Sequence, residues 1–573
     1  MTALRRRTPS LRADARRTAL CLLASLFLSA GVFAADRKPE PVPMPKEEAL
    51  RLGERIYREG ILPSGEPVMA IVQEDIPVDG TMFSCTSCHM RGGLGSNEGR
   101  ISTLPTNGDS LYRPYEDTPV PMTTVEKNFK KFRAAHRRPA YTDETLAEAI
   151  RLGTDPAGRR LDPTMPCYQM NDRDMAILVS YLKVLSSETP PGVTPTNIRF
   201  ATVIAGDVAP EDRDAMILPL EAYVRERNSR SRGLQRRVRM RASMEGLNLA
   251  LRDVSLARWE LRGPPGTWRA QLEEYYRKEP VFAMLGGIGY GDWRPVHDFC
   301  ENHRIPCVFP ITDFPVISES DWYTIYLSKG IYQEGEAAAR YLRREVERVP
   351  ETTIVHVYRD TPGGRALAAG FEETWREMGL PSPECRVLRG DEPVTGKLLR
   401  SLPAKGAHAV LLLWAGPEAA QALEEIAADP ARPGKVFLSY SLWKRNPGTV
   451  PDKARDYTFL TYPYRLPREE GPYGNMARAW LAAKKVPLND RRIATRTYSL
   501  IGVMSQAFGK MRQNIYRDNF IDSISVLPDL LYPDYERLSF GPGQRYASKG
   551  CYIVQLTHGA VPEIVKKSDW VIH

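Results

Sequence analysis

The chain has 573 residues, 42% of them hydrophobic, and a formal net charge of +9 at pH 7. It is too long for one hydrophobic core, so we expect two or three domains. The first 34 residues carry six Arg and one Asp, which leaves +4 for the remainder and excludes a charge-based nucleic-acid function. No later stretch approaches the roughly 18–20 apolar residues that spanning requires. We therefore expect no nucleic-acid partner and no membrane span in the mature chain.

The N-terminus has the pattern of an export signal. Six arginines precede an apolar run over residues 19–34, and Val32-Phe33-Ala34 resembles a signal-peptidase site. We expect residues 1–34 to be a signal peptide that is removed on export. The predicted location of the mature chain is the periplasm.

The run Cys85-Thr86-Ser87-Cys88-His89 is typical of covalent haem attachment. In such a site the two thiols bind the haem vinyl groups and the adjacent imidazole becomes an axial iron ligand. A redox-active pair of cysteines is expected near a βαβ pattern, and a structural zinc site needs a second ligand pair; neither is found nearby. The pattern predicts one haem c held by Cys85 and Cys88, with His89 as an axial ligand of the iron.

Met165 is the predicted second axial ligand. It precedes Pro166 and a helical segment over residues 171–187. Methionine ligation raises the reduction potential of haem iron in a way that suits an electron carrier. Met170 and His136 are the alternatives, although the basic segment around His136 favours a surface position.

Together these motifs resemble a class I cytochrome c domain over residues 45–188. The resemblance includes a first helix that begins near Lys46, with Gly53-Glu54-Arg55-Ile56-Tyr57, and Tyr181-Leu182 in the last helix. It implies an all-α fold around one haem, terminal helices that cross at a glycine and an aromatic residue, and one-electron transfer. Gly53 would let the last helix approach closely, because glycine has no side chain.

The pattern changes after a proline-bearing linker at residues 189–196. From residue 197 onward, short β-rich runs alternate with amphipathic helical segments, which is typical of parallel α/β sheets. The predicted strands are residues 198–204, 281–285, 306–310, 353–358, 409–414 and 435–439.

Residues 197–573 are similar to the type I periplasmic solute-binding proteins, in the branch that binds branched-chain amino acids and amides. The resemblance rests on the order of FAMLGG (282–287), NHRIPCVFP (302–310), YQEG (332–335), GRALAAGF (364–371) and GPGQR (541–545). It implies two α/β lobes, joined by hinge crossovers, that close on a small ligand. The predicted fold class is multidomain, with an all-α cytochrome c domain followed by this two-lobed α/β domain.

Three loops supply the predicted ligand cleft, and their residues depart from the family pattern. Small hydroxyl residues hold the ligand carboxylate in the amino-acid binders, and an acidic group pairs with the ammonium. Here two carboxylates would repel a ligand carboxylate, so an apolar, aromatic or cationic ligand is favoured over a zwitterionic amino acid. The alternative is that the aromatic residues only pack the lobes together. The predicted cleft residues are Tyr290, Asp292, Trp293, Thr312, Asp313, Ser441 and Trp443.

Five cysteines remain besides the haem pair, namely Cys167, Cys300, Cys307, Cys385 and Cys551. An odd number leaves at least one thiol unpaired or paired between chains. Cys300 and Cys307 are the favoured disulfide, because they flank a helix-to-strand turn. The histidines after residue 196 are scattered, and His356 is interpreted as a core residue rather than a ligand. No catalytic residue is predicted.

The sequence therefore predicts a periplasmic monohaem cytochrome that transfers single electrons and carries a small-molecule-binding module. Its predicted partner is a periplasmic dehydrogenase or a terminal oxidase. Three alternatives stay open. The first is a solute-binding protein that serves an ABC permease and carries an accessory haem, and the second is a sensor in which ligand closure changes the haem potential. The third is an enzyme with an open haem position, against which Met165 argues.

Overall fold

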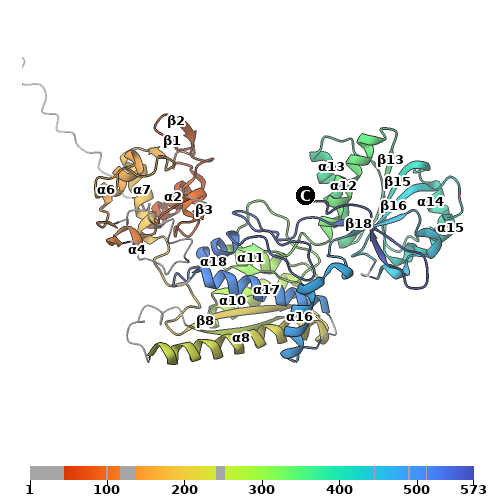
Figure 1. Cartoon of the computed structure of the whole chain (residues 1–573). Coiled ribbons are helices and arrows are strands. Elements are labelled where there is room, and N and C mark those ends of the chain that lie inside the picture. The colour runs from red at the N-terminus through yellow and green to blue at the C-terminus, as the bar shows by residue number, and fades with distance from the viewer. Residues whose placement is uncertain are drawn as a thin grey trace, which may run out of the picture.

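The structure is a computed structural model that describes residues 44–98, 101–116, 137–239, 252–443, 446–487, 491–511 and 513–572. The predicted signal peptide and His136 lie outside the described residues. Figure 1 shows three bodies: an N-terminal module (residues 44–188), lobe I, which is built mainly from residues 197–325 and 491–525, and lobe II, which is built mainly from residues 331–462 and 552–572.

The N-terminal module combines helices with short strands. Its helices are α2 (Lys46–Glu59), α3 (Cys85–His89), α4 (Gly108–Leu111), α6 (Asp143–Leu152) and α7 (Asp172–Val184). An antiparallel sheet has the order β2-β1-β7, from β1 (Met69–Val72), β2 (Ile76–Asp79) and β7 (Cys167–Gln169). Two further ribbons pair β3 (Asn97–Glu98) with β4 (Ile101–Ser102) and β5 (Tyr115–Glu116) with β6 (Arg137–Arg138).

The all-α prediction for this module is therefore wrong. Strands β1 and β7 pair across about 100 residues of chain, and Ala70 and Tyr168, which face each other in the register, are both buried. Strands of three or four residues carry too little alternation to be recognised in the sequence. Their pairing is a long-range event that local patterns do not reveal.

The predicted close approach of the first and last helices at Gly53 is confirmed. A Cβ atom at Gly53 would lie 2.5 Å from Cβ of Tyr181 and 2.6 Å from the carbonyl oxygen of Ile177. The rings of Tyr57 and Tyr181 pack beside this crossing with their centroids 5.7 Å apart. Helices α2 and α7 thus form the core of the module.

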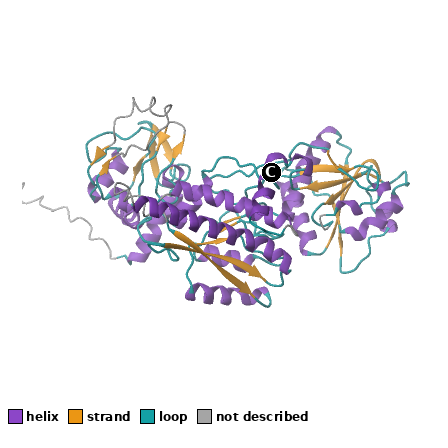
Figure 2. Cartoon of the chain, turned by 60° about the horizontal axis from the view of Figure 1, so that its bottom comes forward, coloured by secondary structure: helices purple, strands orange, loops and turns teal. Residues whose placement is uncertain are grey.

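Lobe I is a parallel sheet covered by helices. Its strand order is β12-β11-β10-β8-β9. The strands are β8 (Asn197–Ala205), β9 (Asp253–Leu261), β10 (Ala283–Leu285), β11 (Cys307–Val308) and β12 (Thr324–Ile325). The covering helices are α8 (Pro210–Arg239), α10 (Trp268–Lys278), α11 (Arg294–Asn302), α17 (Arg491–Met511) and α18 (Arg517–Ser525), and Figure 2 shows these helices against the strands.

Lobe II is a larger sheet with the order β14-β13-β15-β16-β17-β18-β19, of which the last two strands are antiparallel additions. The strands are β13 (Thr353–Arg359), β14 (Glu384–Leu388), β15 (Gly406–Trp414), β16 (Pro433–Ser439), β17 (Thr458–Tyr462), β18 (Tyr552–Leu556) and β19 (Ile564–Lys566). The helices are α12 (Ile331–Arg348), α13 (Pro362–Glu377), α14 (Gly396–Ser401) and α15 (Ala420–Ile426), while α16 (Gly471–Ala483) lies on the way back to lobe I.

In the described part of the chain, three segments cross between the lobes, at residues 326–330, 463–487 and 526–551. The first and third crossovers lie side by side, because the backbone N–H of Tyr326 donates to the carbonyl of Arg545 at 2.7 Å. All six predicted strands are confirmed, since each overlaps a strand of one of the two lobe sheets.

The predicted disulfide between Cys300 and Cys307 does not form. Both thiols are free and completely buried in lobe I. The Cys300 thiol donates to Sδ of Met284 at 3.4 Å. In this apolar core the two sulfur atoms pack as small hydrophobic groups.

We predict that Gly53→Ala destabilises the N-terminal module by about 1–3 kcal/mol, because the added methyl group overlaps the backbone and Cβ of α7. Urea unfolding followed by circular dichroism measures this change. Gly509→Ala in α17 is the control, since a Cβ there meets nothing within 4 Å. A loss of stability that is equal in both variants would contradict the prediction.

Candidate functional site

A pocket lies where the two lobes and the crossovers meet. Lobe I contributes Pro310, Thr312 and Asp313 from the segment after β11, and Arg496 from α17. Lobe II contributes Ser441 from the loop after β16. The remaining walls are Pro315 of lobe I, the start of α12 and crossover residues, namely Leu327, Ser328, Gly330, Ile331, Pro463, Tyr464 and Tyr535. The lining therefore combines polar side chains with apolar residues such as Leu327 and Ile331.

Arg496 is the charged group of this pocket that the sequence did not indicate. One of its Nη atoms donates to the hydroxyl of Tyr464 at 2.7 Å, while its buried Nε has no hydrogen-bond partner among the described residues. Burial lowers the pKa of Arg496, but the nearby Tyr464, Tyr535 and Asp534 outweigh burial and raise it overall. The guanidinium is therefore a fixed positive charge with a spare donor at the pocket.

A second carboxyl group and a second guanidinium stand beside Arg496. Burial raises the pKa of Asp534 to about 6, although hydrogen bonding from Thr495 and the charges of Arg496 and Arg492 oppose this. The guanidinium of Arg492 lies 4.6 Å from the ring centroid of Tyr464. The positive charge of the two arginines at this wall of the pocket is offset by Asp534 and by Asp313, both of which act on Arg496.

Glu334 lies on the lobe II side of the pocket, within α12. Its side chain is fully buried and accepts a hydrogen bond from Thr461 Oγ1 at 2.8 Å. Burial raises the pKa of Glu334, and the hydroxyl groups of Ser441, Thr461 and Ser439 oppose this rise. Glu334 thus orients the hydroxyl of Ser441 at the pocket.

The structure brings together three of the predicted cleft residues, Thr312, Asp313 and Ser441, in this pocket. The other four do not line it. Trp293 and Trp443 are completely buried in the cores of the lobes. Asp292 accepts a hydrogen bond from the backbone N–H of Arg294, the first residue of α11. Tyr290 is exposed, and its hydroxyl donates to Asp212. Arg496, Tyr464 and Tyr535 could not be found from the sequence, because they come from a helix and two crossovers that are distant in the chain.

The Cys85–His89 run forms the short helix α3, which α2 holds in place. Thr86 Oγ1 donates to the carbonyl of Arg58 at 3.2 Å, and the Tyr57 hydroxyl donates to the carbonyl of Met90 at 2.8 Å. Cys85 and Cys88 lie on this one turn of helix, and neither forms a disulfide. The two thiols and the imidazole therefore lie on one short rigid element.

One ring nitrogen of His89 is hydrogen-bonded within the protein, and the other is left to bind a ligand. Its Nδ1 lies 2.8 Å from the carbonyl oxygen of Leu104, which assigns the proton to Nδ1. Nε2 is buried without a partner among the described residues. Burial lowers the pKa of His89, which keeps the ring neutral. Met165 and Met170 both pack, partly buried, against the same core cluster as Cys85. The residues present therefore fit a covalently bound haem.

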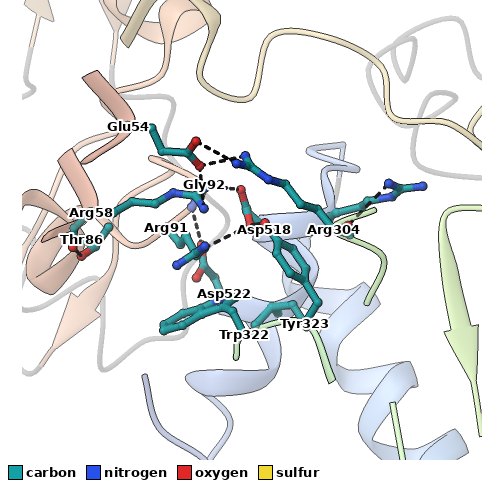
Figure 3. Close-up of polar contacts among 12 residues, drawn as sticks. Glu54, Arg58, Thr86, Arg91, Gly92, Arg304, Trp322, Tyr323, Asp518 and Asp522 are labelled. Carbon is teal, nitrogen blue, oxygen red and sulfur yellow. Dashed lines mark hydrogen bonds and ion pairs between the residues drawn. The ribbon is translucent and has the colours of Figure 1, made fainter. Parts of the chain in front are cut away.

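The segment just after His89 is docked on lobe I (Figure 3). Arg58 pairs with Asp518 of α18 at 2.7 Å, and Arg91 reaches the same carboxylate at 3.5 Å. The Arg91 guanidinium also stacks on Trp322, with 4.4 Å to the ring centroid. Arg304 of lobe I binds both carboxylate oxygens of Glu54 at 2.8 and 2.9 Å.

Asp522, one turn along α18 from Asp518, is the most buried carboxyl group of this interface. Its Oδ2 accepts a hydrogen bond from the backbone N–H of Gly92 at 2.6 Å. Burial raises the pKa of Asp522 to about 7, and the Gly92 hydrogen bond opposes this rise. Trp322 is stacked by Arg91 and, at 4.5 Å, by Arg545 of the third crossover. The interface therefore extends from the His89 segment to the hinge region.

Comparison with protein-family models matches residues 252–560 to the periplasmic binding protein family. This range covers more than half of the chain and spans both lobes, so the chain belongs to the periplasmic binding protein family. Membership implies a periplasmic location and a solute-binding fold. Among the described residues, no helix is long and apolar enough to cross a membrane. A comparison with curated proteins found no match.

Several solved structures are similar to the chain. A putative branched-chain amino acid ABC transporter from Rhodospirillum rubrum is 14% identical over 65% of this chain and 100% of its own, with a TM-score of 0.46. An ABC transporter substrate-binding protein from Sphaerobacter thermophilus is 13% identical over 66% and 98%, with a TM-score of 0.48. A branched chain amino acid ABC transporter from Thermus thermophilus with bound valine is 12% identical over 67% and 97%, with a TM-score of 0.45.

We predict that Asp518→Asn weakens the docking of the N-terminal module by about 2 kcal/mol, because the buried guanidinium of Arg58 then keeps only Glu54 as a charged partner. Limited proteolysis of residues 187–196 and the radius of gyration from X-ray scattering report undocking. Asp172→Asn is the control, since Asp172 is 99% exposed where it pairs with Arg151. Unchanged proteolysis and scattering of Asp518→Asn would refute this role.

We also predict that Asp522 makes the protein less stable as the pH rises from about 4 to about 7, whereas His89 and His356, whose pKa values are lowered by burial, act in the opposite direction up to about pH 6.5. The pKa of Asp522 is raised from 3.8 to about 7, so in this range the folded state binds more protons than the unfolded state. Asp522→Asn should flatten this part of the profile, which thermal unfolding at pH 5 and pH 8 measures. The raised pKa of Asp534 likewise makes the protein less stable as the pH rises to about 6, and this contribution remains in Asp522→Asn. An identical pH profile in the wild type and Asp522→Asn would contradict the prediction.

Proposed function

We propose that this protein binds a small organic carboxylate in the pocket between its lobes. The observation that carries the proposal is the buried Nε of Arg496, which has no hydrogen-bond partner among the described residues that surround the pocket. A buried donor on a charged group is costly when it is left unpaired, so it favours an anionic partner. The family to which the chain belongs supports solute binding between two lobes.

The other lining groups narrow the class of ligand. Leu327, Ile331 and the three prolines form apolar surface, which suits an aliphatic or aromatic body. Thr312 and Ser441 offer hydroxyl groups on opposite lobes, so a ligand that contacts both would hold the lobes together. Asp313 adds an acceptor that suits a hydroxyl or amino group on the ligand. Of the two aspartates that weighed against a carboxylate ligand in the sequence, Asp292 lies outside the pocket, and the charge of Asp313 is countered by Arg496.

In this proposal the binding half serves an ABC permease, as in the transport alternative derived from the sequence. A ligand that contacts both lobes binds the closed form more tightly than the open form. It therefore shifts the protein toward the closed form. A permease that recognises the closed form would then receive only loaded protein.

We predict that 3-methylbutanoate or benzoate raises the Tm of the protein, whereas 3-methylbutanamide and benzamide do not, because only the acids pair with Arg496. Arg496→Gln should weaken acid binding by about 10–100-fold, as expected for the loss of a charged hydrogen bond. Isothermal titration calorimetry measures the affinities. Ser441→Ala should weaken binding less than Arg496→Gln does, and circular dichroism checks its fold, because the buried Glu334 loses the Ser441 hydroxyl.

Arg400→Gln is the matched control, since Arg400 lies on lobe II and pairs with Asp429 at the surface. Amides that bind as tightly as the acids would overturn the carboxylate class but leave solute binding intact. No binding by acids, amides or amines, together with no small molecule released on denaturation of the purified protein, would overturn solute binding itself.

A second function is favoured by His89. We further propose that the N-terminal module carries one haem c, with Cys85 and Cys88 as the attachment residues, and His89 and Met165 as the axial ligands. The unpartnered Nε2 of His89, on the same helical turn as both thiols, supports this. A haem with His and Met ligands supplies one-electron transfer. The chain's own residues hold the imidazole neutral and oriented through Leu104, and a periplasmic dehydrogenase or terminal oxidase is the expected partner.

We predict a low-spin optical spectrum for the exported protein, with a weak Met-to-iron band that Met165→Ala removes. Met170→Ala is the control, because Met170 packs against the same core. Mass spectrometry after denaturation should show one haem covalently attached, and Cys88→Ser should weaken this attachment. A chain without attached haem would overturn this function, and a band lost in Met170→Ala instead would reassign the axial ligand.

A further inference from the structure

Lobe II carries a cluster of three side chains outside the pocket that could ligate a metal. The cluster consists of His356 on β13, Glu372 on α13 and Cys385 on β14. One ligand atom from each side chain lies within 4.8 Å of the others. The three residues are separated by turns and a helix in the chain, so the fold alone brings them together.

The sheet register explains this arrangement. His356 and Cys385 are direct partners on the neighbouring parallel strands β13 and β14. Register partners on adjacent strands point to the same face of a sheet. Helix α13 covers this face, since Phe371 packs on the His356 ring with centroids 5.8 Å apart, and Glu372 follows Phe371 directly. The carboxylate therefore reaches the cluster from above the sheet.

Both ring nitrogens of His356 are buried without a well-directed hydrogen bond to a described residue. The side chain is completely buried. Nδ1 lies 3.3 Å from a carboxylate oxygen of Glu372. Trp414 holds the ring from one side with centroids 4.5 Å apart. A buried polar ring in this state is unfavourable unless a partner occupies the space beside it.

The chemistry of the three donor atoms indicates which metal ion the cluster would bind. One nitrogen, one thiolate sulfur and one carboxylate oxygen suit Zn²⁺, whereas Mg²⁺ and Ca²⁺ require oxygen donors. Three protein ligands leave the fourth tetrahedral position for water. The double positive charge of Zn²⁺ balances the thiolate and the carboxylate, so the occupied cluster would be neutral.

We propose that His356, Glu372 and Cys385 form a zinc site in lobe II. The ion enters from solvent, because Cys385 is exposed and β14 is the edge strand of the sheet. On binding, the Cys385 thiol releases its proton to solvent, and no oxidant or reductant takes part. The site joins the edge strand to α13. His356 is thus buried, as the sequence indicated, but serves as a ligand.

The exported full-length protein is first freed of metal with a chelator that is then removed. It is next titrated with Zn²⁺ in the presence of a chromophoric chelator, which competes for the ion and reports the affinity. Cys385→Ser and Glu372→Gln should each bind one Zn²⁺ at least about tenfold more weakly than the wild type. With Co²⁺ as the probe, the wild type should show a sulfur-to-cobalt charge-transfer band that Cys385→Ser removes. Any Zn²⁺ that binds at Cys85, Cys88 and His89 in chains without haem would bind equally in all variants. The difference in Zn²⁺ affinity between the wild type and each variant therefore reports on the lobe II cluster.

Two matched controls accompany these variants. Glu373→Gln changes the neighbouring carboxylate, which accepts a hydrogen bond from Tyr332, and Cys167→Ser removes a thiol of the N-terminal module. Both should bind Zn²⁺ like the wild type. Circular dichroism checks the fold of each variant, and Glu372→Gln decides the result if Cys385→Ser does not fold. Equal affinity for Zn²⁺ in the wild type and the cluster variants, or a cobalt band that Cys385→Ser leaves intact, would overturn the proposal.

Discussion

The buried contact between Arg58 and Asp518 determines how the two halves of this protein lie together. A guanidinium that is removed from water needs charged partners at close range, and Glu54 of α2 and Asp518 of α18 both pair with Arg58 at 2.7 Å. Arg91 and Tyr323 add two more contacts to the same carboxylate. Since Arg91 follows His89 by two residues, the Cys85–His89 run is held against lobe I rather than at the end of a free tether.

The same interface reaches toward the pocket through aromatic and charged groups. Trp322 is stacked by Arg91 from the N-terminal module and by Arg545 from the third crossover. Glu301 fixes this segment by accepting hydrogen bonds from the backbone N–H groups of residues 322–324. The crossovers also supply Tyr464 and Tyr535 to the pocket. Direct contacts therefore link the His89 segment to Trp322 and the third crossover, and the same crossover supplies Tyr535 to the pocket.

Much of the fold could be predicted from local patterns. Strands such as β13 and β15 are short apolar runs between helical segments, and Gly53 marks a helix crossing because nothing larger fits against Tyr181. Strands β1 and β7 could not be predicted, since their pairing joins residues about 100 positions apart. In the pocket, Thr312, Asp313 and Ser441 follow sheet strands and were predictable from that position, whereas Arg496 lies in a helix whose pattern indicates only packing.

The sequence by itself determined the elements whose cause is local, namely the Cys85–His89 run, the alternation of strands and helices after residue 196, and the glycine at the helix crossing. Only the tertiary structure decided which polar groups meet. It placed Trp293 and Trp443 in cores, brought Arg496 to the pocket, and set His356 beside Glu372 and Cys385. The physical reason is that charge pairing and metal ligation depend on distances of a few ångströms between residues far apart in the chain, and these distances are set by sheet register and helix packing.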